Sequence, residues 1–245
     1  MHYQQFESED QRLKIKVVIP NASVEFKDNQ IQDRKKIASP GTEVEVVCLK
    51  HGPVSIESSY DEALAAPHIV EEVRRAEAEG FDAVSIDCAM DTVVRGSREA
   101  VGIPVTSAGE ASYLLAMGLC ARFSVVTVLK STAQTIGENI EKYGFKSRVA
   151  SVRYADIPVL DLKNEKKAYG AILRESKRAV EEDGAEAIVL GCTGMSSLAA
   201  KLQVKLGIPV IDPATASLKL AELYVSAGLI KSGIAYGEPS KKEVK

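Results

Sequence analysis

Two cysteines, Cys88 and Cys192, each follow a short apolar run and precede a turn of small residues. The first lies in GFDAVSIDCAM (80–90) and the second in GAEAIVLGCTGM (184–195). The two cysteines are 104 positions apart, and the Gly, the acidic residue and the Ala before them repeat at that same spacing. Parallel α/β proteins bind ligands at the carboxyl ends of such buried strands. We therefore expect both thiols to enter one site from two sides.

A pair of opposed thiols can move a proton from one face of a carbon stereocentre to the other. One thiolate acts as the base, the other thiol acts as the acid, and the two exchange roles in the reverse direction. We expect the helix starts after Cys88 and Cys192 to lower the pKa of each thiol and to bind an oxyanion. The alternative is that the repeat records an old duplication and that both cysteines pack in the core, as free cysteines commonly do.

Other patterns that carry chemistry are missing from the sequence. Cys48 and Cys120 lie in the apolar runs VEVVCLK and MGLCARF, which are typical of small buried thiols. The cysteines form no C-x-x-C pair and have no histidine at metal-ligand spacing, so we expect no metal site. The chain contains no G-x-G-x-x-G or P-loop motif, and a Ser-His-Asp arrangement has no local support. We expect no cofactor.

The composition limits the partners. The 31 basic and 34 acidic residues are well mixed and give a net charge of -3, which provides no broad positive surface for nucleic acid or acidic lipid. Although 45% of the residues are hydrophobic, no run of about 18 apolar residues and no secretory signal is found. We expect a cytoplasmic protein that binds a small molecule, with no membrane and no nucleic-acid partner.

A second repeat supports a duplicated fold. The segment GIPV occurs at 102–105 and again at 207–210, 105 positions later. Alternating strands and helices in two copies predict an α/β protein of two pseudo-symmetric lobes, each a roughly four-stranded parallel sheet flanked by helices, with the active site in the cleft between them. We place the first lobe at 1–108 plus 213–245, with 1–12 as a mobile tail, and the second lobe at 109–212.

Two local predictions concern segments near the first cysteine. The stretch 51–60 (HGPVSIESSY) is polar, carries Gly and Pro, and is longer than most strand-to-helix connections, which is typical of a lid. The helical pattern over 61–79 contains Pro67, so we expect that helix to begin near Pro67 or to kink there. GIPV at 102–105 is expected to open a short fourth strand.

Several segments resemble one known family, the aspartate/glutamate/hydantoin racemase superfamily. They are PGTEVEVV (40–47), GPVSIE (52–57), YDEA (60–63) with Pro67, GEAS (109–112) and RFSVVT (122–127). The resemblance extends from residue 14 to about residue 239, and GP-x-SIE with YDEA indicates the hydantoin and allantoin racemase branch. It implies a cofactor-independent isomerase that racemises or epimerises hydantoin-like substrates, such as 5-substituted hydantoins or allantoin, and that forms a homo-oligomer.

The resemblance also implies roles for particular residues. Cys88 and Cys192 correspond to the acid/base pair of a 1,1-proton transfer. The implied substrate-binding residues are Asn21, Ser23, Ala89, Met90, Thr127, Thr193, Gly194 and Glu110. Backbone N–H groups near Ala89 and near Thr193 and Gly194 are expected to hold the carbonyl or carboxylate beside the stereocentre. Glu110 either orients a ring N–H of the substrate or caps the helix that begins there.

Departures from the branch pattern keep other reactions open. The chain reads AMDTV at 89–93, where hydantoin racemases typically read FGDPG, so the pocket wall differs in shape. Thr193 after the second cysteine resembles the amino-acid racemases instead. The alternatives are an aspartate- or glutamate-type amino-acid racemase, a cis-trans isomerase or decarboxylase of the same superfamily, and an inert small-molecule-binding protein.

Overall fold

The computed structural model describes residues 12–23 and 27–240. The strands are β1 (Leu13–Ile19), β2 (Thr42–Cys48), β3 (Ala83–Ile86), β4 (Val105–Ser107), β5 (Phe123–Thr127), β6 (Val149–Tyr154), β7 (Ala187–Leu190) and β8 (Val210–Ile211). The α-helices are α1 (Lys27–Ile37), α2 (Ser59–Ala78), α3 (Val94–Ala100), α4 (Ala108–Leu119), α5 (Lys130–Lys142), α6 (Glu165–Asp183), α7 (Ala199–Leu206) and α8 (Pro213–Ser226). Short 3-10 helices are η1 (Lys146–Arg148), η2 (Val159–Lys163) and η3 (Thr193–Leu198).

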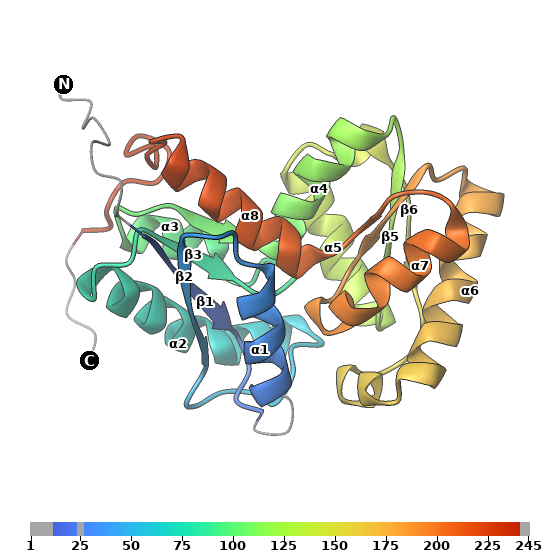
Figure 1. The fold of residues 1–245 in the computed structure, drawn as a ribbon, viewed down its shortest axis with the longest axis horizontal. Coiled ribbons are helices and arrows are strands. Elements are labelled where there is room, and N and C mark those ends of the chain that lie inside the picture. Colours follow the sequence, from blue (N-terminus) through green and yellow to red (C-terminus); the bar gives the residue numbers. More distant parts are fainter. Residues whose placement is uncertain (1–11, 24–26, 241–245) are drawn as a thin grey trace.

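The strands form two sheets of four, in the orders β2-β1-β3-β4 and β6-β5-β7-β8, and every pairing is parallel. Figure 1 shows the two sheets side by side, with helices around each. The inner strands β3 and β7, with the sequences AVSI and AIVL, are mainly apolar and buried at every residue, because a parallel sheet is covered on both faces. The predicted fold class is confirmed.

The chain crosses twice between the sheets. Helix α4 follows β4 of the first sheet yet packs against β7 and β8 of the second, whereas α8 follows β8 and packs against β1, β3 and β4. Buried hydroxyl groups hold α8 in place, since Ser217 Oγ lies 2.7 Å from Ser85 Oγ and 3.0 Å from Thr106 Oγ1. We propose lobes of 1–108 with 213–245 and of 109–212, and these crossings support that division.

Two element boundaries differ from those expected. The expected helix start near Pro67 is wrong, while a kink at Pro67 stays a prediction. Helix α2 begins at Ser59 and runs through Pro67, because Ser58 caps it: its Oγ accepts the N–H of Asp61, and its hydroxyl donates to the Asp61 carboxylate. The fourth strand begins only at Val105, after Pro104, since proline cannot donate to the sheet. A capping hydroxyl sets the boundary of α2, and a residue without an N–H group sets that of β4.

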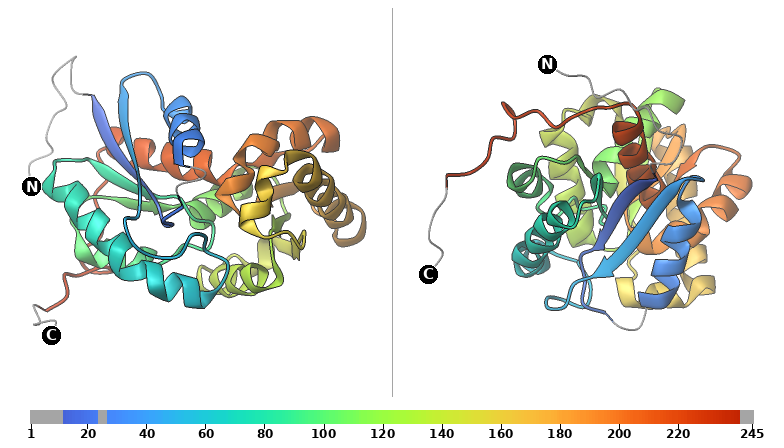
Figure 2. Two further views of the ribbon diagram at one scale, coloured as in Figure 1. Left: turned by 90° about the horizontal axis from the view of Figure 1, so that it is seen from below. Right: turned by 60° about the vertical axis from the view of Figure 1, so that its left-hand side comes forward.

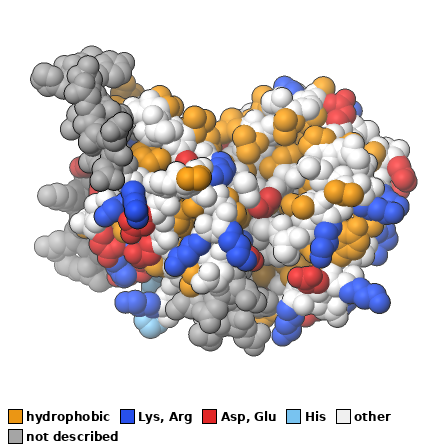
Figure 3. All heavy atoms as spheres, viewed as in Figure 1, with side chains coloured by type: hydrophobic (Ala, Val, Ile, Leu, Met, Phe, Trp, Pro, Cys, Tyr) orange, Lys and Arg blue, Asp and Glu red, His pale blue; other side chains and the backbone are white. Residues whose placement is uncertain are grey.

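The surface agrees with the mixed charge of the sequence. On the face drawn in Figure 3, acidic and basic side chains are interspersed, and a shallow notch separates the two lobes. Within the described residues, no helix is long and apolar enough to cross a membrane.

Candidate active site

A small cavity of about 50 Å³ lies between the two sheets and contains both cysteines of the repeat. Residues from both halves of the chain line it: Pro20, Asn21, Gln30, Ile56, Asp87, Cys88, Ala89, Met90, Val128, Thr132, Val159, Gly191, Cys192, Thr193 and Gly194. Cys88 follows β3 and Cys192 follows β7, which are inner strands of their sheets. The strand ends therefore bring both thiols to one cavity, as the sequence predicts for this fold.

The turn after Cys88 is held by the carboxylate of Asp91. That side chain accepts the N–H of Gly109 at 2.8 Å and the N–H of Glu110 at 2.9 Å, at the start of α4. Asp91 itself adopts φ 56°, and its N–H donates to the Cys88 carbonyl at 3.1 Å. Gly109 has to be glycine, because a Cβ there would lie 2.5 Å from the Ala89 carbonyl oxygen. The turn that carries Cys88 is thus fixed to the first turn of α4.

The turn after Cys192 depends on a close approach of two backbone segments. A Cβ on Gly191 would lie 2.5 Å from the Cβ of Thr127, and Thr127 Oγ1 donates to the Gly191 carbonyl at 2.9 Å. The N–H of Gly194 faces the Cys192 sulfur and favours its thiolate. The 3-10 helix η3 starts at Thr193, directly after the cysteine. By contrast, α3 starts only at Val94, six residues after Cys88.

Two hydrogen bonds join the lobes beside the cysteines, and an ion pair within the first lobe supports them. Arg34 of α1 donates from Nε to the Asp87 carboxylate at 2.9 Å and from Nη2 to the Thr193 carbonyl at 3.1 Å. Thr193 Oγ1 in turn donates to the Asp87 carbonyl at 3.2 Å. Arg34 and Asp87 are both about 3% exposed. Arg34 and the Thr193 hydroxyl therefore fix the residue before Cys88 against the residue after Cys192.

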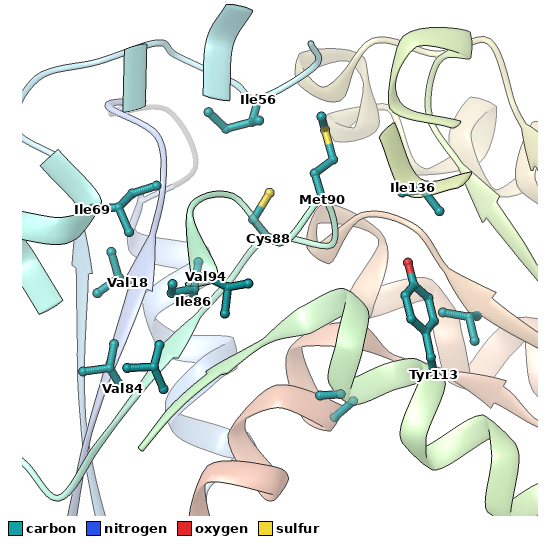
Figure 4. Packing of buried hydrophobic residues seen from close by; sticks show 14 of the residues in the cluster. Val18, Ile56, Ile69, Val84, Ile86, Cys88, Met90, Val94, Tyr113 and Ile136 are labelled. Carbon is teal, nitrogen blue, oxygen red and sulfur yellow. The ribbon is translucent and has the colours of Figure 1, made fainter. Parts of the chain in front are cut away.

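The loop of residues 51–58 crosses to the second lobe. Ser131 Oγ donates to the Glu57 carbonyl, and the Val159 N–H donates to the Glu57 carboxylate, each at 2.6 Å. Ile56 lines the cavity, and Figure 4 shows the Cys88 sulfur pointing toward it. The loop covers the cavity in this conformation, and its opening as a lid stays a prediction.

The thiols are less acidic than the sequence led us to expect. Burial raises the pKa of Cys88 from 9.0 to about 12, although hydrogen bonds from the Thr92 hydroxyl and the Met90 N–H lower it in part. Burial likewise raises the pKa of Cys192 to about 11, opposed by the Gly194 N–H. The predicted lowering of the pKa is wrong, because burial destabilises each thiolate more than the hydrogen-bond donors stabilise it. Both groups are thiols at neutral pH.

The structure brings most of the predicted substrate-binding residues to the cavity. Asn21, Ala89, Met90, Thr193 and Gly194 all line it with the two cysteines. Two others lie behind it. Thr127 is buried beneath Gly191, and Ser23 is buried with its N–H donated to Asn21 Oδ1 at 3.2 Å. Their contribution is to hold the lining residues in position.

Glu110 lies away from the cavity lining. Its carboxylate is bound by the guanidinium of Arg98, whose Nη1 also lies 3.4 Å from the Tyr236 hydroxyl. The expectation that the Glu110 side chain caps its helix is wrong, because the Asp91 carboxylate accepts the first N–H groups of α4. A substrate contact of Glu110 would require this ion pair to open.

Several residues beside the cysteines are not among those predicted from the sequence. Asp87 directly precedes Cys88 and ends an apolar strand, so a buried acid with a basic partner could have been inferred from that position. Arg34 and Glu62 carry no local signal, because they approach from α1 and α2, whereas Thr92 lies in the turn four residues after Cys88. No group of three or more His, Cys, Asp or Glu side chains able to hold a metal ion occurs among residues 12–23 and 27–240.

The fold and this site define a class: a two-lobed parallel α/β protein with one cysteine from each lobe at a shared interlobe cavity. The profile of the family Asp/Glu/Hydantoin racemase matches residues 15–221. The hydantoin racemase of Pseudomonas sp. (strain NS671) is 42% identical over 94% of this chain and 94% of its own, and that of Rhizobium meliloti is 36% identical over 94% and 96%. The allantoin racemase from Klebsiella pneumoniae superposes with a TM-score of 0.91 at 35% identity, covering 95% of this chain and 96% of the other.

The chain therefore belongs to the Asp/Glu/hydantoin racemase family, as its sequence segments predict, and it is an isomerase. A glutamate racemase from Francisella tularensis, at 16% identity and a TM-score of 0.64, shares the fold alone.

Proposed function

We propose that this protein racemises hydantoin-like substrates, either 5-substituted hydantoins or allantoin, by a 1,1-proton transfer between Cys88 and Cys192. The observation that carries the proposal is that one cysteine from each lobe lines the same cavity. The names of the relatives support the substrate class, because two are hydantoin racemases and one similar structure is an allantoin racemase.

The reaction needs one thiolate and one thiol at the start. The thiolate of one cysteine removes the proton from the carbon next to the carbonyl, and the electron pair moves onto the carbonyl oxygen. The other thiol then delivers its proton to the opposite face of the same carbon, so the two cysteines exchange protonation states and the substrate changes configuration. No oxidation and no covalent bond to the enzyme is involved.

The backbone can stabilise the negative charge that develops on the substrate oxygen. The turns after Cys88 and Cys192 present N–H groups toward the sulfur atoms, from Met90 and Gly194. Donors held in a water-poor cavity stabilise an enolate more strongly than water does. The raised pKa values of both thiols mean that one must lose its proton before turnover, so activity should rise with pH above neutrality.

The test uses enantiopure 5-substituted hydantoins and allantoin in D₂O, with the uncatalysed rate subtracted. We expect loss of optical rotation and entry of deuterium at the stereocentre without any other change in the product. Cys88→Ser and Cys192→Ser should each abolish inversion, while each variant still exchanges deuterium into the one enantiomer that its remaining cysteine faces. Cys48→Ser and Cys120→Ser, outside the cavity, serve as matched controls with full activity.

Other outcomes would point to the alternative functions. Inversion that survives in both cysteine variants would contradict the two-thiol mechanism. A product with a new double-bond geometry or with loss of CO₂ would indicate an isomerase or decarboxylase reaction instead. Turnover of aspartate or glutamate, and not of hydantoins, would indicate an amino-acid racemase.

Oligomeric state and location belong to the same proposal. We propose a homo-oligomer in the cytoplasm. The exposed side chains of Leu114, Leu115 and Leu119 form an apolar stretch on α4 that is compatible with a subunit contact. Light scattering on the purified protein would test the assembly, and a monomeric mass at micromolar concentration would contradict it.

A further inference from the structure

A single hydroxyl group lies between Cys88 and a carboxylate from another helix. Thr92 Oγ1 is 3.5 Å from Cys88 Sγ and 3.1 Å from Glu62 Oε1, and Thr92 is 1% exposed. Glu62 comes from the first turn of α2, where the cap at Ser58 fixes the helix start. The threonine therefore touches the thiol on one side and the carboxylate on the other, with little access to water.

The hydroxyl has one proton, so it cannot donate to both neighbours at once. When Cys88 is a thiol, the Thr92 hydroxyl donates its hydrogen bond to the Glu62 carboxylate. The threonine oxygen can then accept a hydrogen bond from the S–H group. When Cys88 is a thiolate, the sulfur needs a donor, and the hydroxyl proton must turn from Glu62 to sulfur. The two hydrogen bonds are therefore alternatives, and each belongs to one protonation state of Cys88.

We propose that Thr92 is a hydrogen-bond switch for Cys88, and that the Glu62 carboxylate competes with the Cys88 sulfur for the hydrogen bond from the Thr92 hydroxyl. This inference rests on the proposed function, in which Cys88 must serve as base for one enantiomer and as acid for the other. Thr92 and Glu62 are positioning residues, because they act on the sulfur and do not line the cavity. Ionised Glu62 holds Cys88 as the acid, and loss of that negative charge releases the hydroxyl to support the base.

The groups around Glu62 agree with a carboxyl that can change its charge. Burial raises the pKa of Glu62, the hydrogen bond from Thr92 opposes the rise, and the nearby charges of Glu138 and Asp61 raise it further. The positive charge of Lys142 lowers it. Helix α5 supplies Glu138 and Lys142, and the left view of Figure 2 shows it next to α2, as the 3.5 Å approach of the Ser59 and Thr135 hydroxyls requires.

The groups that face Cys88 are few. Besides Thr92, the sulfur has the Met90 N–H as a donor and the Cys192 thiol as its neighbour across the cavity. Tyr113 points its hydroxyl toward the Met90 turn in Figure 4, and that oxygen has no hydrogen-bond partner among the described residues. Thr92 is thus the side-chain donor on which the Cys88 thiolate depends.

The test is the rate of alkylation of each cysteine by iodoacetamide between pH 7 and pH 10, measured by peptide mass spectrometry on the full-length protein. Only the thiolate reacts, so the rate below the pKa reports the thiolate fraction, and one pKa unit is a tenfold change. Thr92→Val keeps the shape and removes the hydroxyl, Thr92→Ser keeps the hydroxyl, and Glu62→Gln keeps the shape and removes the charge.

We expect Thr92→Val to slow alkylation of Cys88 by about tenfold or more, since a hydrogen bond to a charged group is lost. Glu62→Gln should accelerate it, and Thr92→Ser should match the native rate. Cys192 in the same protein is the internal control, with an unchanged rate in all three variants. Equal rates at Cys88 in Thr92→Val and the native chain would overturn the switch, as would changes of the same sign in Thr92→Val and Glu62→Gln.

Failure of the switch and failure of the proposed function are distinguishable. Alkylation needs no turnover, so a chain without racemase activity can still show opposite shifts in Thr92→Val and Glu62→Gln. A parallel slowing or acceleration of Cys88 and Cys192 in the threonine variant would show a general change of the cavity and would count against the inference.

Discussion

The guanidinium of Arg34 in the first lobe donates a hydrogen bond of 3.1 Å to the backbone carbonyl of Thr193 in the second. Because Arg34 also pairs with Asp87, one side chain contacts the residue before Cys88 and the residue after Cys192. The distance between the two thiols therefore depends on a side chain that touches neither of them. This arrangement makes the relative position of the lobes part of the site.

Removal of Arg34 should lower both stability and activity. Arg34→Met leaves the Asp87 carboxylate buried without its partner, which we expect to lower the free energy of unfolding by about 3–5 kcal/mol. Urea denaturation followed by circular dichroism measures this change. The double variant Arg34→Met, Asp87→Asn should recover much of the stability but little of the racemisation rate, because the contact with the Thr193 carbonyl stays absent.

An exposed pair provides the control for that prediction. Arg95 binds Glu99 one helical turn away, and the Arg95 side chain is 62% exposed. Arg95→Met should change stability by less than about 1 kcal/mol, since exposed ion pairs contribute little. A loss of similar size in the Arg34 and Arg95 variants would contradict the assigned role of the buried pair.

Gly191→Ala should displace Cys192. The new Cβ would lie 2.5 Å from the Cβ and 3.0 Å from the Cα of Thr127, so the backbone of one turn has to move. We expect the free energy of unfolding to fall by about 1–3 kcal/mol and the racemisation rate to fall with it. Gly170→Ala is the matched control, because nothing lies within 4 Å of its Cβ inside α6, and alanine there should stabilise the helix by about 0.5–1 kcal/mol. Full racemase activity in Gly191→Ala would contradict the prediction, because it would mean that the turn accepts the added Cβ without displacing Cys192.

The buried thiols should make the protein less stable in alkali. Their pKa values rise from 9.0 in the free side chain to about 12 at Cys88 and about 11 at Cys192. The folded chain therefore keeps two protons that the unfolded chain releases above pH 9. The stabilisation is complete below pH 9 and is lost at higher pH by about 1.4 kcal/mol per pH unit for each thiol, up to about pH 12 for Cys88 and about pH 11 for Cys192.

The measurement is the urea midpoint at pH 8, 9, 10 and 11. Cys88→Ala and Cys192→Ala should each make the urea midpoint fall less steeply with rising pH. This holds even if a variant is less stable than the native chain at pH 8. An alkaline decline that is as steep in both variants as in the native chain would mean that other groups cause it.

The sequence by itself determined the fold and the family. The repeats around Cys88 and Cys192 and of the segment GIPV, together with buried strands that alternate with helices, were enough to predict two parallel sheets, because hydrophobic periodicity and strand-to-helix order are local properties of the chain. The turn residues beside the cysteines were also predictable, since they follow the strand ends directly.

Only the tertiary structure decided which residues surround the cysteines and how acidic they are. Arg34 and Glu62 reach the site from helices that are distant in sequence from the cysteines, so no spacing pattern predicts their positions. The same holds for the capping of α4 by Asp91, which leaves Glu110 to bind Arg98. The pKa of each thiol depends on burial, and burial is set by the closure of two lobes over the cavity, a property of the whole packed chain.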